Sequence, residues 1–458
     1  MNALIVLACL GIVAMMSEVL GFKKFLLPIV ALGLVSVIGL FVMDWNTAIR
    51  YYNDMLYFDN YAIAFSAMVT VLTALWLIMS KEYFISTSSK AEHAALILFC
   101  LTGAIVMISY SDLSMLFIGI EILSISLYVL AASNKNDLRS NEAGLKYFLM
   151  GAFATGFLLF GITLIYGASG SFNLQEIANY ISTNSGHLPM FVYAGVLLML
   201  VGLLFKVSAA PFHFWAPDVY EGSPTLVTAF MSTVVKTAAF AAFYRLFATC
   251  FSDLSGWWGE TLAFVAALTM LVGNVLAVMQ QNFKRMLAYS SIAHAGYMLM
   301  AIVAMSHVSA GAIFLYTTAY SVASLGAFAC LHTLGANNNE KIINLKGLIA
   351  KQPLNAGLLC LAMLSLAGIP PLAGFFAKYY LFYGVIQSGY LWLVMVAVLS
   401  SLIGVYYYFR VIYTMFLPRE EEDGVLPQIS GSHKILLTIA AILSLLMGIF
   451  PGILQGLL

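Results

Sequence analysis

Long apolar stretches separated by short polar segments run along the whole chain of 458 residues. A helix needs about 20 consecutive apolar residues to cross the hydrocarbon core of a bilayer. Cutting the sequence at its polar and Gly/Pro-rich segments leaves fourteen apolar stretches that are long enough to cross the membrane. They comprise residues 3–20, 25–43, 61–79, 94–110, 113–132, 143–166, 190–209, 225–250, 261–280, 286–306, 311–334, 354–387, 390–417 and 435–454. The pattern therefore predicts an all-α integral membrane protein with about fourteen transmembrane helices.

The composition agrees with this pattern and removes several classes of protein. Hydrophobic residues make up 62% of the chain and charged residues only 9%, whereas soluble domains carry roughly 25% charged residues. A water-soluble enzyme is therefore excluded. The 20 basic and 20 acidic residues balance, so no electrostatic case exists for nucleic acid as a partner. The longest polar stretches, residues 169–188 and 418–433, have the size of loops.

The five cysteines do not form a recognisable ligand set. Each lies in an apolar run, without a CxxC pair and without a histidine at ligand spacing, which argues against disulfides, zinc and iron–sulfur clusters. We expect them to be buried thiols, and we expect no metal or cofactor site in this chain. The five are Cys9, Cys100, Cys250, Cys330 and Cys360.

The basic residues are distributed unevenly between the connections. Fifteen of the 20 fall in one alternate set of connections, and the opposite set holds only Arg50 and Arg245. Because positive residues gather on the cytoplasmic side of membrane proteins, both termini are predicted to lie on the non-cytoplasmic side. The remaining three basic residues, Lys206, Lys236 and Lys378, lie inside apolar sequence.

Two segments do not fit a straight helix. Residues 354–387 would form a helix about 51 Å long, against a hydrocarbon core of about 30 Å, and they contain Pro370 and Pro371. Residues 206–225 contain three prolines next to a lysine. The interruptions, at helices 7/8 and 12, are five helices apart, a spacing that indicates two inverted five-helix repeats.

Four charged residues are expected inside the membrane: Glu121, Lys206, Lys236 and Lys378. Each buried lysine costs roughly 2.5–3.5 kcal/mol on insertion scales. A static ion pair between Glu121 and Lys206 is one explanation. The other is a proton relay, because desolvation weakens the hold of a buried amine on its proton. Lys236 and Lys378 favour the relay, since Glu121 cannot neutralise every lysine.

Two histidines are further candidates for such a relay. His294 lies in the tenth predicted helix and His213 lies in the proline-rich interruption. An imidazole titrates near neutral pH, but a structural hydrogen bond between helices is the alternative explanation for each. Both assignments stay open at this point.

Three stretches are similar to a known family. They read LFKVSAAPFHFWAPDVYEGSPT from residue 204, NFKRMLAYSSIAHAGYM from residue 282 and LAGIPPLAGFFAKYYLF from residue 366. They resemble the antiporter-like subunits of the proton-pumping NADH:quinone oxidoreductase, respiratory complex I. The resemblance covers roughly residues 113–416. It is greatest to the branch that has a lysine, in place of a glutamate, at Lys378 and that ends after the fourteenth helix.

The resemblance implies an organisation and a role for the charged residues. Glu121 and Lys206 match a pair on the fifth and seventh helices, and Lys236 and Lys378 match the lysines of the eighth and the broken twelfth helix. The implied repeats are helices 4–8 and 9–13 around a hydrated polar axis. The implied segments are residues 1–93, 94–250, 251–417 and 418–458.

The implied function is that of one proton-translocating module of a larger complex in the bacterial inner membrane. The expected partners are the other membrane subunits of the complex, neighbouring antiporter-like subunits among them. NADH oxidation and quinone reduction would belong to other subunits, so no redox chemistry is expected in this chain alone. 

Two alternatives come from other classes of protein. A subunit of a multisubunit Na+/H+ antiporter would use the same charged row, but Glu121 is the one carboxylate placed deep in a helix to coordinate sodium. A purely structural membrane scaffold would carry no buried lysine beyond paired ones, which Lys236 and Lys378 argue against.

Overall fold

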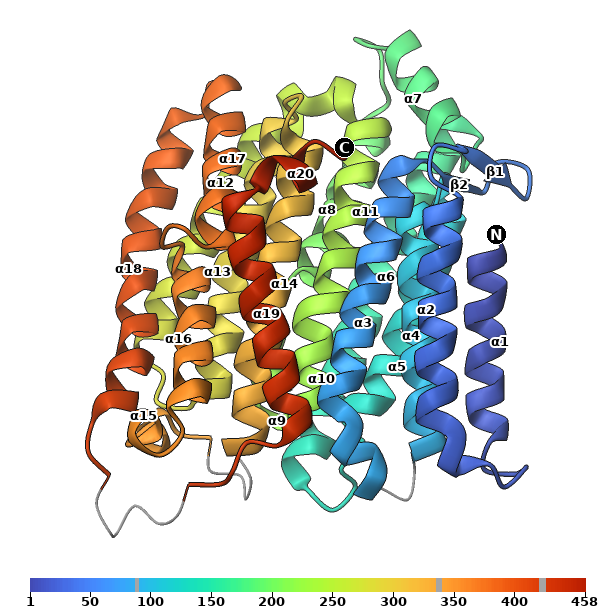
Figure 1. Ribbon diagram of the computed structural model, residues 1–458. Coiled ribbons are helices and arrows are strands. Elements are labelled where there is room, and N and C mark those ends of the chain that lie inside the picture. The colour runs from blue at the N-terminus through green and yellow to red at the C-terminus, as the bar shows by residue number, and fades with distance from the viewer. Residues whose placement is uncertain (87–89, 335–339, 420–425) are drawn as a thin grey trace. The chain divides into compact units, whose positions relative to one another are not determined.

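The computed structural model describes residues 1–86, 90–334, 340–419 and 426–458. These residues are helical almost throughout (Figure 1). Among them, eleven helices are long and apolar enough to cross a membrane, and three shorter apolar helices are Asn2–Met16, Met190–Lys206 and Pro353–Ala367. The prediction of a helical, multi-pass membrane protein is confirmed.

The chain forms two compact units, each described here by itself. The first unit comprises Met1–Leu77, Lys81–Ser208 and Val234–Leu262. The second unit comprises Ile78–Ser80, Ala209–Thr233 and Ala263–Leu458. 

The first unit contains the N-terminal helices and most of the elements up to the middle of the chain. Its elements, some of which extend past its limits, are α1 (Asn2–Met16), η1 (Lys23–Phe25), α2 (Leu26–Met43), β1 (Ile49–Tyr51), β2 (Leu56–Phe58), α3 (Asn60–Ser86), α4 (Lys90–Ser109), α5 (Leu113–Ala131), α6 (Leu138–Ser169), α7 (Leu174–Thr183), α8 (Met190–Lys206), α11 (Lys236–Thr249), η3 (Ser252–Leu254) and the start of α12 (Ser255–Val278).

A short antiparallel hairpin departs from the all-α prediction. Strands β1 and β2 pair with Ile49 opposite Phe58 and Tyr51 opposite Leu56. Each strand has only three residues, which is below the four to eight over which alternation becomes readable in a sequence. The apolar pattern therefore contains no signal for this hairpin.

Helix α7 lies within residues 169–188, where the sequence predicts a loop. Its buried residues Leu174, Ile177 and Ile181 follow the i, i+3, i+7 spacing of an amphipathic helix. Asn173 caps its start, with the side-chain oxygen accepting hydrogen bonds from the backbone N–H groups of Gln175 and Glu176. The helical spacing is thus present in the sequence, in a segment too short to span a membrane.

Glycines allow α4 and α5 to pack closely in the first unit. A side chain at Gly103 of α4 would come within 2.6 Å of the backbone nitrogen of Leu123. One at Gly119 of α5 would come within 2.7 Å of the backbone nitrogen of Met107. Small residues at such crossings let helix backbones approach, and here they fix the part of α5 that carries Glu121.

The second unit contains the C-terminal helices. Its elements are α9 (Trp215–Gly222), α10 (Thr225–Phe230), the start of the π-helical turn η2 (Met231–Val235), the rest of α12, α13 (Phe283–Ala304), α14 (Ser309–Leu334), η4 (Ile342–Leu345), α15 (Leu348–Lys351), α16 (Pro353–Ala367), α17 (Ala373–Gln387), α18 (Leu391–Phe416), α19 (Gly431–Ile449) and α20 (Pro451–Gln455).

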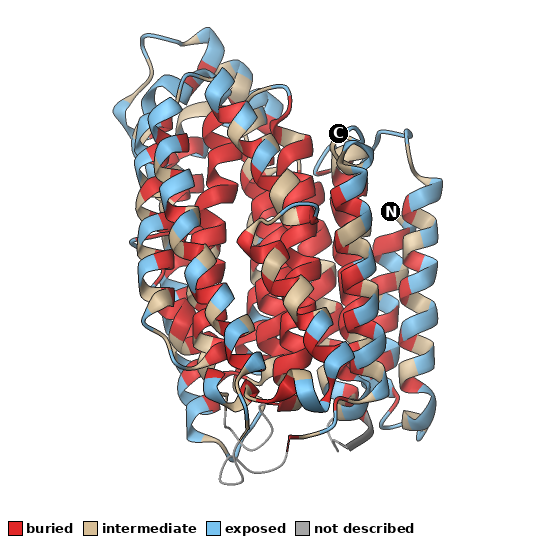
Figure 2. Cartoon of the chain, turned by 60° about the vertical axis from the view of Figure 1, so that its left-hand side comes forward, coloured by how far each residue is buried: buried red, intermediate tan, exposed pale blue. Residues whose placement is uncertain are grey.

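Helix α14 forms the core of the second unit. The most apolar part of α14 is buried completely, and it packs against α13, α16, α17 and α19. Helix α18 is buried along one face and exposes large apolar residues such as Leu399 and Leu402 along the other. Figure 2 shows the same division between buried and exposed positions on other outer helices. Exposed apolar faces of this kind suit contact with lipid.

The double proline interrupts its helix as predicted. Helix α16 ends at Ala367, and Gly368 follows in a left-handed conformation with φ of 85°. Helix α17 begins five residues later, at Ala373. Because Pro370 and Pro371 lack backbone donors, they cannot continue the hydrogen-bond ladder of α16.

Candidate functional site

Lys206 is the last residue of α8, and it reaches across to α5. Its Nζ donates a hydrogen bond of 2.7 Å to Ser124 Oγ, and Ser124 Oγ in turn donates to the carbonyl of Ile120. A cavity of about 10 Å³ lies beside this contact, lined among others by Tyr128 and Gly202. That volume is close to the minimum that holds one water molecule.

Glu121 lies at the centre of α5, where the sequence predicted it. It precedes Ser124 by three residues and shares its face of the helix. Among the described residues, Glu121 Oε1 is buried without a hydrogen-bond partner. Its charge is nevertheless within electrostatic reach of Lys206. The hydrogen bond of Lys206 thus goes to Ser124, while the carboxylate that the resemblance pairs with it lies one helical turn away.

Lys236 is the first residue of α11 and is 3% exposed. It directly follows the π-helical turn of Met231–Val235. Such turns are rare in proteins and often occur at functional sites. The prediction of an uninterrupted helix over residues 225–250 missed this turn, because π-helical geometry has no distinctive sequence pattern.

Lys378 lies in the second turn of α17 and is 8% exposed. Its Nζ donates hydrogen bonds to the carbonyl of Ala367 at 2.9 Å and to Ser401 Oγ at 2.7 Å. The ammonium group also lies 5.2 Å from the centre of the Tyr297 ring, within the range of a cation–π interaction.

The interruption of the helix explains this binding mode. The last carbonyls of any helix lack intrahelical partners and carry the negative end of the helix dipole. Ala367 is the last residue of α16, so its carbonyl is available to the ammonium group of Lys378. Gly368 leaves room for that group, since a side chain there would lie 3.0 Å from Nζ.

His294 is enclosed by tyrosines in the second unit. Its Nδ1 lies 2.8 Å from Tyr316 Oη and its Nε2 lies 3.0 Å from Tyr408 Oη. Tyr408 Oη also forms a short hydrogen bond with Ser290 Oγ. Because hydroxyl groups both donate and accept, this chain of groups can pass a proton in either direction.

A second cavity of about 10 Å³ adjoins His294. It is also lined by Ser365 of α16 and by Gly374 and Ala377 of α17. Ala377 is the neighbour of Lys378, so the cavity lies between the histidine and the interrupted helix. The Tyr297 ring lies 5.2 Å from Lys378 Nζ and 6.0 Å from the His294 ring, so it connects the two residues beside the interruption.

His213 lies between α8 and α9, in the proline-rich segment, and is 5% exposed. Within the described part of the chain, its Nδ1 is buried without a hydrogen-bond partner. The nearby backbone is anchored by Ala210 N–H, which donates to Thr269 Oγ1 at 2.9 Å. His213 is therefore buried and available for a further hydrogen bond, but it is not joined directly to His294 by any hydrogen bond among the described residues.

Two basic residues assigned to connections lie in buried positions instead. Lys284 falls in the first turn of α13, is 3% exposed and forms an ion pair with Glu340 at 3.4 Å. Its Nζ also donates to the carbonyl of Ser223 at 2.5 Å. Asn282 caps this helix, and an asparagine before an apolar run was a usable start signal. Arg245 lies inside α11, paired with Asp59.

Two further expectations concern metals and thiols. Within the residues that the structure describes, no cluster of three or more His, Cys, Asp or Glu side chains has the arrangement of a metal site. Cys100, Cys250 and Cys330 are buried as expected. Cys9 is exposed and Cys360 is partly exposed, because α1 and α16 each present one apolar face outward.

Comparisons with known proteins give a consistent result. The family model described as NADH:quinone oxidoreductase/Mrp antiporter, TM, matches residues 110–404. The chain is 42% identical to NADH-quinone oxidoreductase subunit N of Flavobacterium psychrophilum, over 100% of both chains. It is 43% identical to the subunit N of Cytophaga hutchinsonii, over 99% of this chain and 98% of that one.

A solved structure shares the fold along nearly the whole chain. A chain of respiratory complex I from Thermus thermophilus superposes with a TM-score of 0.84 and 32% sequence identity. The match covers 99% of this chain and 98% of that chain.

Proposed function

Because the chain belongs to the subunit N branch of the NADH:quinone oxidoreductase/Mrp antiporter family and is a membrane subunit of NADH:quinone oxidoreductase, we propose that it translocates protons as one pumping module of that complex. The protons move along a row of buried groups, joined by water. The row comprises Glu121, Lys206, Lys236, Lys378, His294 and His213.

One observation carries the proposal. The ammonium groups of Lys206 and Lys378 are buried in helical sequence, yet their hydrogen bonds go to neutral acceptors. No ion pair with a carboxylate fixes either charge among the described residues. A static stabilising role calls for such pairing, because an uncompensated buried charge is costly. A lysine held by neutral groups can instead release its proton and keep its hydrogen-bonded position.

Glu121 influences whether Lys206 holds or releases its proton. Ser124 accepts the hydrogen bond of Lys206. Glu121 lies three residues before Ser124, which is about 4.5 Å along α5 at about 1.5 Å per residue. The flexible lysine side chain can therefore alternate between Ser124 and Glu121. Near the carboxylate the protonated form is favoured, and near the serine proton release becomes easier. The pair acts as a switch that loads and unloads Lys206.

The interruption between α16 and α17 supplies access to Lys378. Irregular backbone at membrane depth is tolerated where it is buried in protein or lines a hydrated cavity. The small cavity beside Gly374 is also lined by His294, Tyr316 and Ser365, whose polar groups can bind one water molecule. Through it, His294 and its tyrosine partners deliver protons toward Lys378 or accept them from it.

The finer organisation belongs to the same proposal. Ten of the fourteen predicted spans, helices 4–8 and 9–13, form two inverted five-helix repeats, and both termini lie on the non-cytoplasmic side of the bacterial inner membrane. Neighbouring antiporter-like subunits are the partners within the complex. The distribution of basic residues in the sequence and the position of the interrupted helices support this arrangement.

The test is NADH-driven ion uptake by the purified complex in proteoliposomes, with protons and radioactive sodium measured separately. We expect proton uptake without sodium uptake, and a lower proton uptake in the Lys236→Ala complex. The exposed Lys351 provides the matched control, Lys351→Ala. Sodium uptake that depends on Lys236 would contradict proton translocation and support the antiporter alternative.

A further inference from the structure

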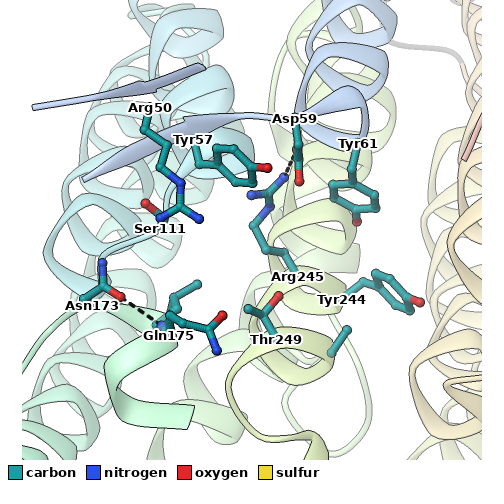
Figure 3. A pocket seen from close by; sticks show the side chains of 12 residues that line it. Arg50, Tyr57, Asp59, Tyr61, Ser111, Asn173, Gln175, Tyr244, Arg245 and Thr249 are labelled. Carbon is teal, nitrogen blue, oxygen red and sulfur yellow. Dashed lines mark hydrogen bonds and ion pairs between the residues drawn. The ribbon is translucent and has the colours of Figure 1, made fainter. Parts of the chain in front are cut away.

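A cavity of about 270 Å³ lined by several charged and polar side chains lies in the first unit, apart from the residues of the proposed relay (Figure 3). Its walls come from strands β1 and β2, the start of α3, the end of α11 and the start of α7. All these positions lie at the ends of helices or between them. In a bilayer, the ends of spanning helices reach the level of the lipid headgroups.

Two guanidinium groups face the interior of this cavity. Arg50 of β1 and Arg245 of α11 stand on opposite sides of the open space in Figure 3. They are also the two basic residues on the sparsely charged side of the predicted topology. Both basic residues predicted on that side of the membrane therefore line the same cavity.

The nearby carboxylates do not occupy all the hydrogen-bond donors of the two guanidinium groups. Arg50 and Asp54 are both half-exposed and 3.6 Å apart, so their attraction is weak. Arg245 is 6% exposed and paired with Asp59 through one Nη, while its Nε has no hydrogen-bond partner among the described residues. Asp59 is itself engaged by the backbone N–H of Ala62. The other Nη of Arg245 forms no hydrogen bond with the described residues and is not among the buried atoms, so it can donate to an acceptor in the cavity.

Aromatic rings hold both guanidinium groups in place. Arg50 lies 4.6 Å from the centre of the Tyr57 ring, and Arg245 lies 5.2 Å from that of Tyr61. Stacking of this kind fixes the plane of the guanidinium group and leaves its edge free to donate hydrogen bonds. Gln175, at the start of α7, adds a polar side chain to the wall (Figure 3).

We propose that this cavity binds a phosphate-bearing anion, with Arg50 and Arg245 as its ligands. Paired guanidinium groups match the geometry of phosphate oxygens and form strong charge-assisted hydrogen bonds with them. The position at the helix ends suits the phosphodiester of an anionic lipid headgroup, and free phosphate presents the same chemistry. This site is independent of the proton relay.

The experiment uses the purified complex in detergent and measures binding of radiolabelled dioctanoylphosphatidylglycerol by equilibrium dialysis. Inorganic phosphate and dioctanoylglycerol, which lacks phosphate, serve as competitors. We expect Arg50→Gln to weaken one tight site by at least about tenfold, the loss expected when a charged hydrogen bond to the anion is removed. Arg139→Gln is the matched control, because Arg139 is exposed and outside the cavity.

The competitors separate the two sources of phosphate. Competition by inorganic phosphate at similar concentrations would identify a free anion as the ligand. Tight lipid binding that phosphate does not displace would identify a lipid headgroup. Equal binding by the Arg50→Gln and Arg139→Gln complexes, or full displacement by dioctanoylglycerol, would overturn the proposal. Arg245→Lys, which keeps the charge beside Asp59, provides a second variant and should also weaken the site.

Discussion

Lys378 Nζ donates a hydrogen bond to the carbonyl of Ala367, the residue at which α16 ends. The two residues are eleven positions apart, with Ala367 before the interruption and Lys378 after it. A backbone carbonyl released by the interruption therefore takes the place that a carboxylate would fill in an ion pair. The hydrogen bonding of the Lys378 ammonium group therefore depends on the interruption between α16 and α17.

The first prediction concerns the residue that makes room for this contact. Gly368→Ala places a side chain 3.0 Å from Lys378 Nζ and forces a left-handed conformation on a residue that disfavours it. The conformational cost alone is about 1–2 kcal/mol. We expect a lower unfolding temperature of the purified complex and slower proton uptake. Gly357→Ala is the control, because Gly357 lies in α16 with open space around it and alanine is the better helix former, so this change should lower neither quantity.

The second prediction concerns the interruption itself. Replacing Pro370 and Pro371 by alanine restores two backbone donors and should extend α16 toward α17, so that the Ala367 carbonyl is no longer available. We expect proton uptake to fall more than the amount of assembled complex, both measured on the same membranes. Pro353→Ala is the control, since a proline in the first turn of a helix interrupts no hydrogen bond. Equal losses of uptake and assembly would indicate that the interruption serves packing.

The positions of the buried charges could be predicted from the sequence because each is conspicuous in apolar surroundings. Glu121, Lys206 and Lys378 all lie where the sequence placed them along their helices. The interruption between α16 and α17 could also be predicted from the sequence, since the double proline and the excess length of the apolar stretch both require it. In each case the signal was local in the chain.

The partners of those charges could not be predicted, because they depend on tertiary packing. Ser124 and Ser401 are ordinary serines in apolar helices, and nothing in their neighbourhood marks them as acceptors for lysine. The Ala367 carbonyl becomes an acceptor only when α17 folds back beside the end of α16. Lys284 shows a different limit, since its burial depends on contacts with residues far along the chain, Glu340 among them.

The third prediction concerns the switch between Glu121 and Lys206. We expect Glu121→Gln to lower proton uptake, and Glu121→Asp to be milder because it keeps the charge. In a double-mutant cycle with Lys206→Ala, the two losses should be non-additive, with a coupling of roughly 0.5–3 kcal/mol. Ser124→Ala should favour the Glu121-bound position of Lys206 and slow proton release. Fully additive losses from Glu121→Gln and Lys206→Ala would show that the two residues do not act together.

The rate of NADH-driven proton uptake by Lys378→Ala proteoliposomes tests the central claim most directly. Removing a buried charge eases membrane insertion, so the subunit should still assemble, and the rate is compared at equal amounts of complex. We predict a rate well below that of the Lys351→Ala control, because the relay loses the group held at the helix interruption. A Lys378→Ala complex that takes up protons at the control rate would contradict the account.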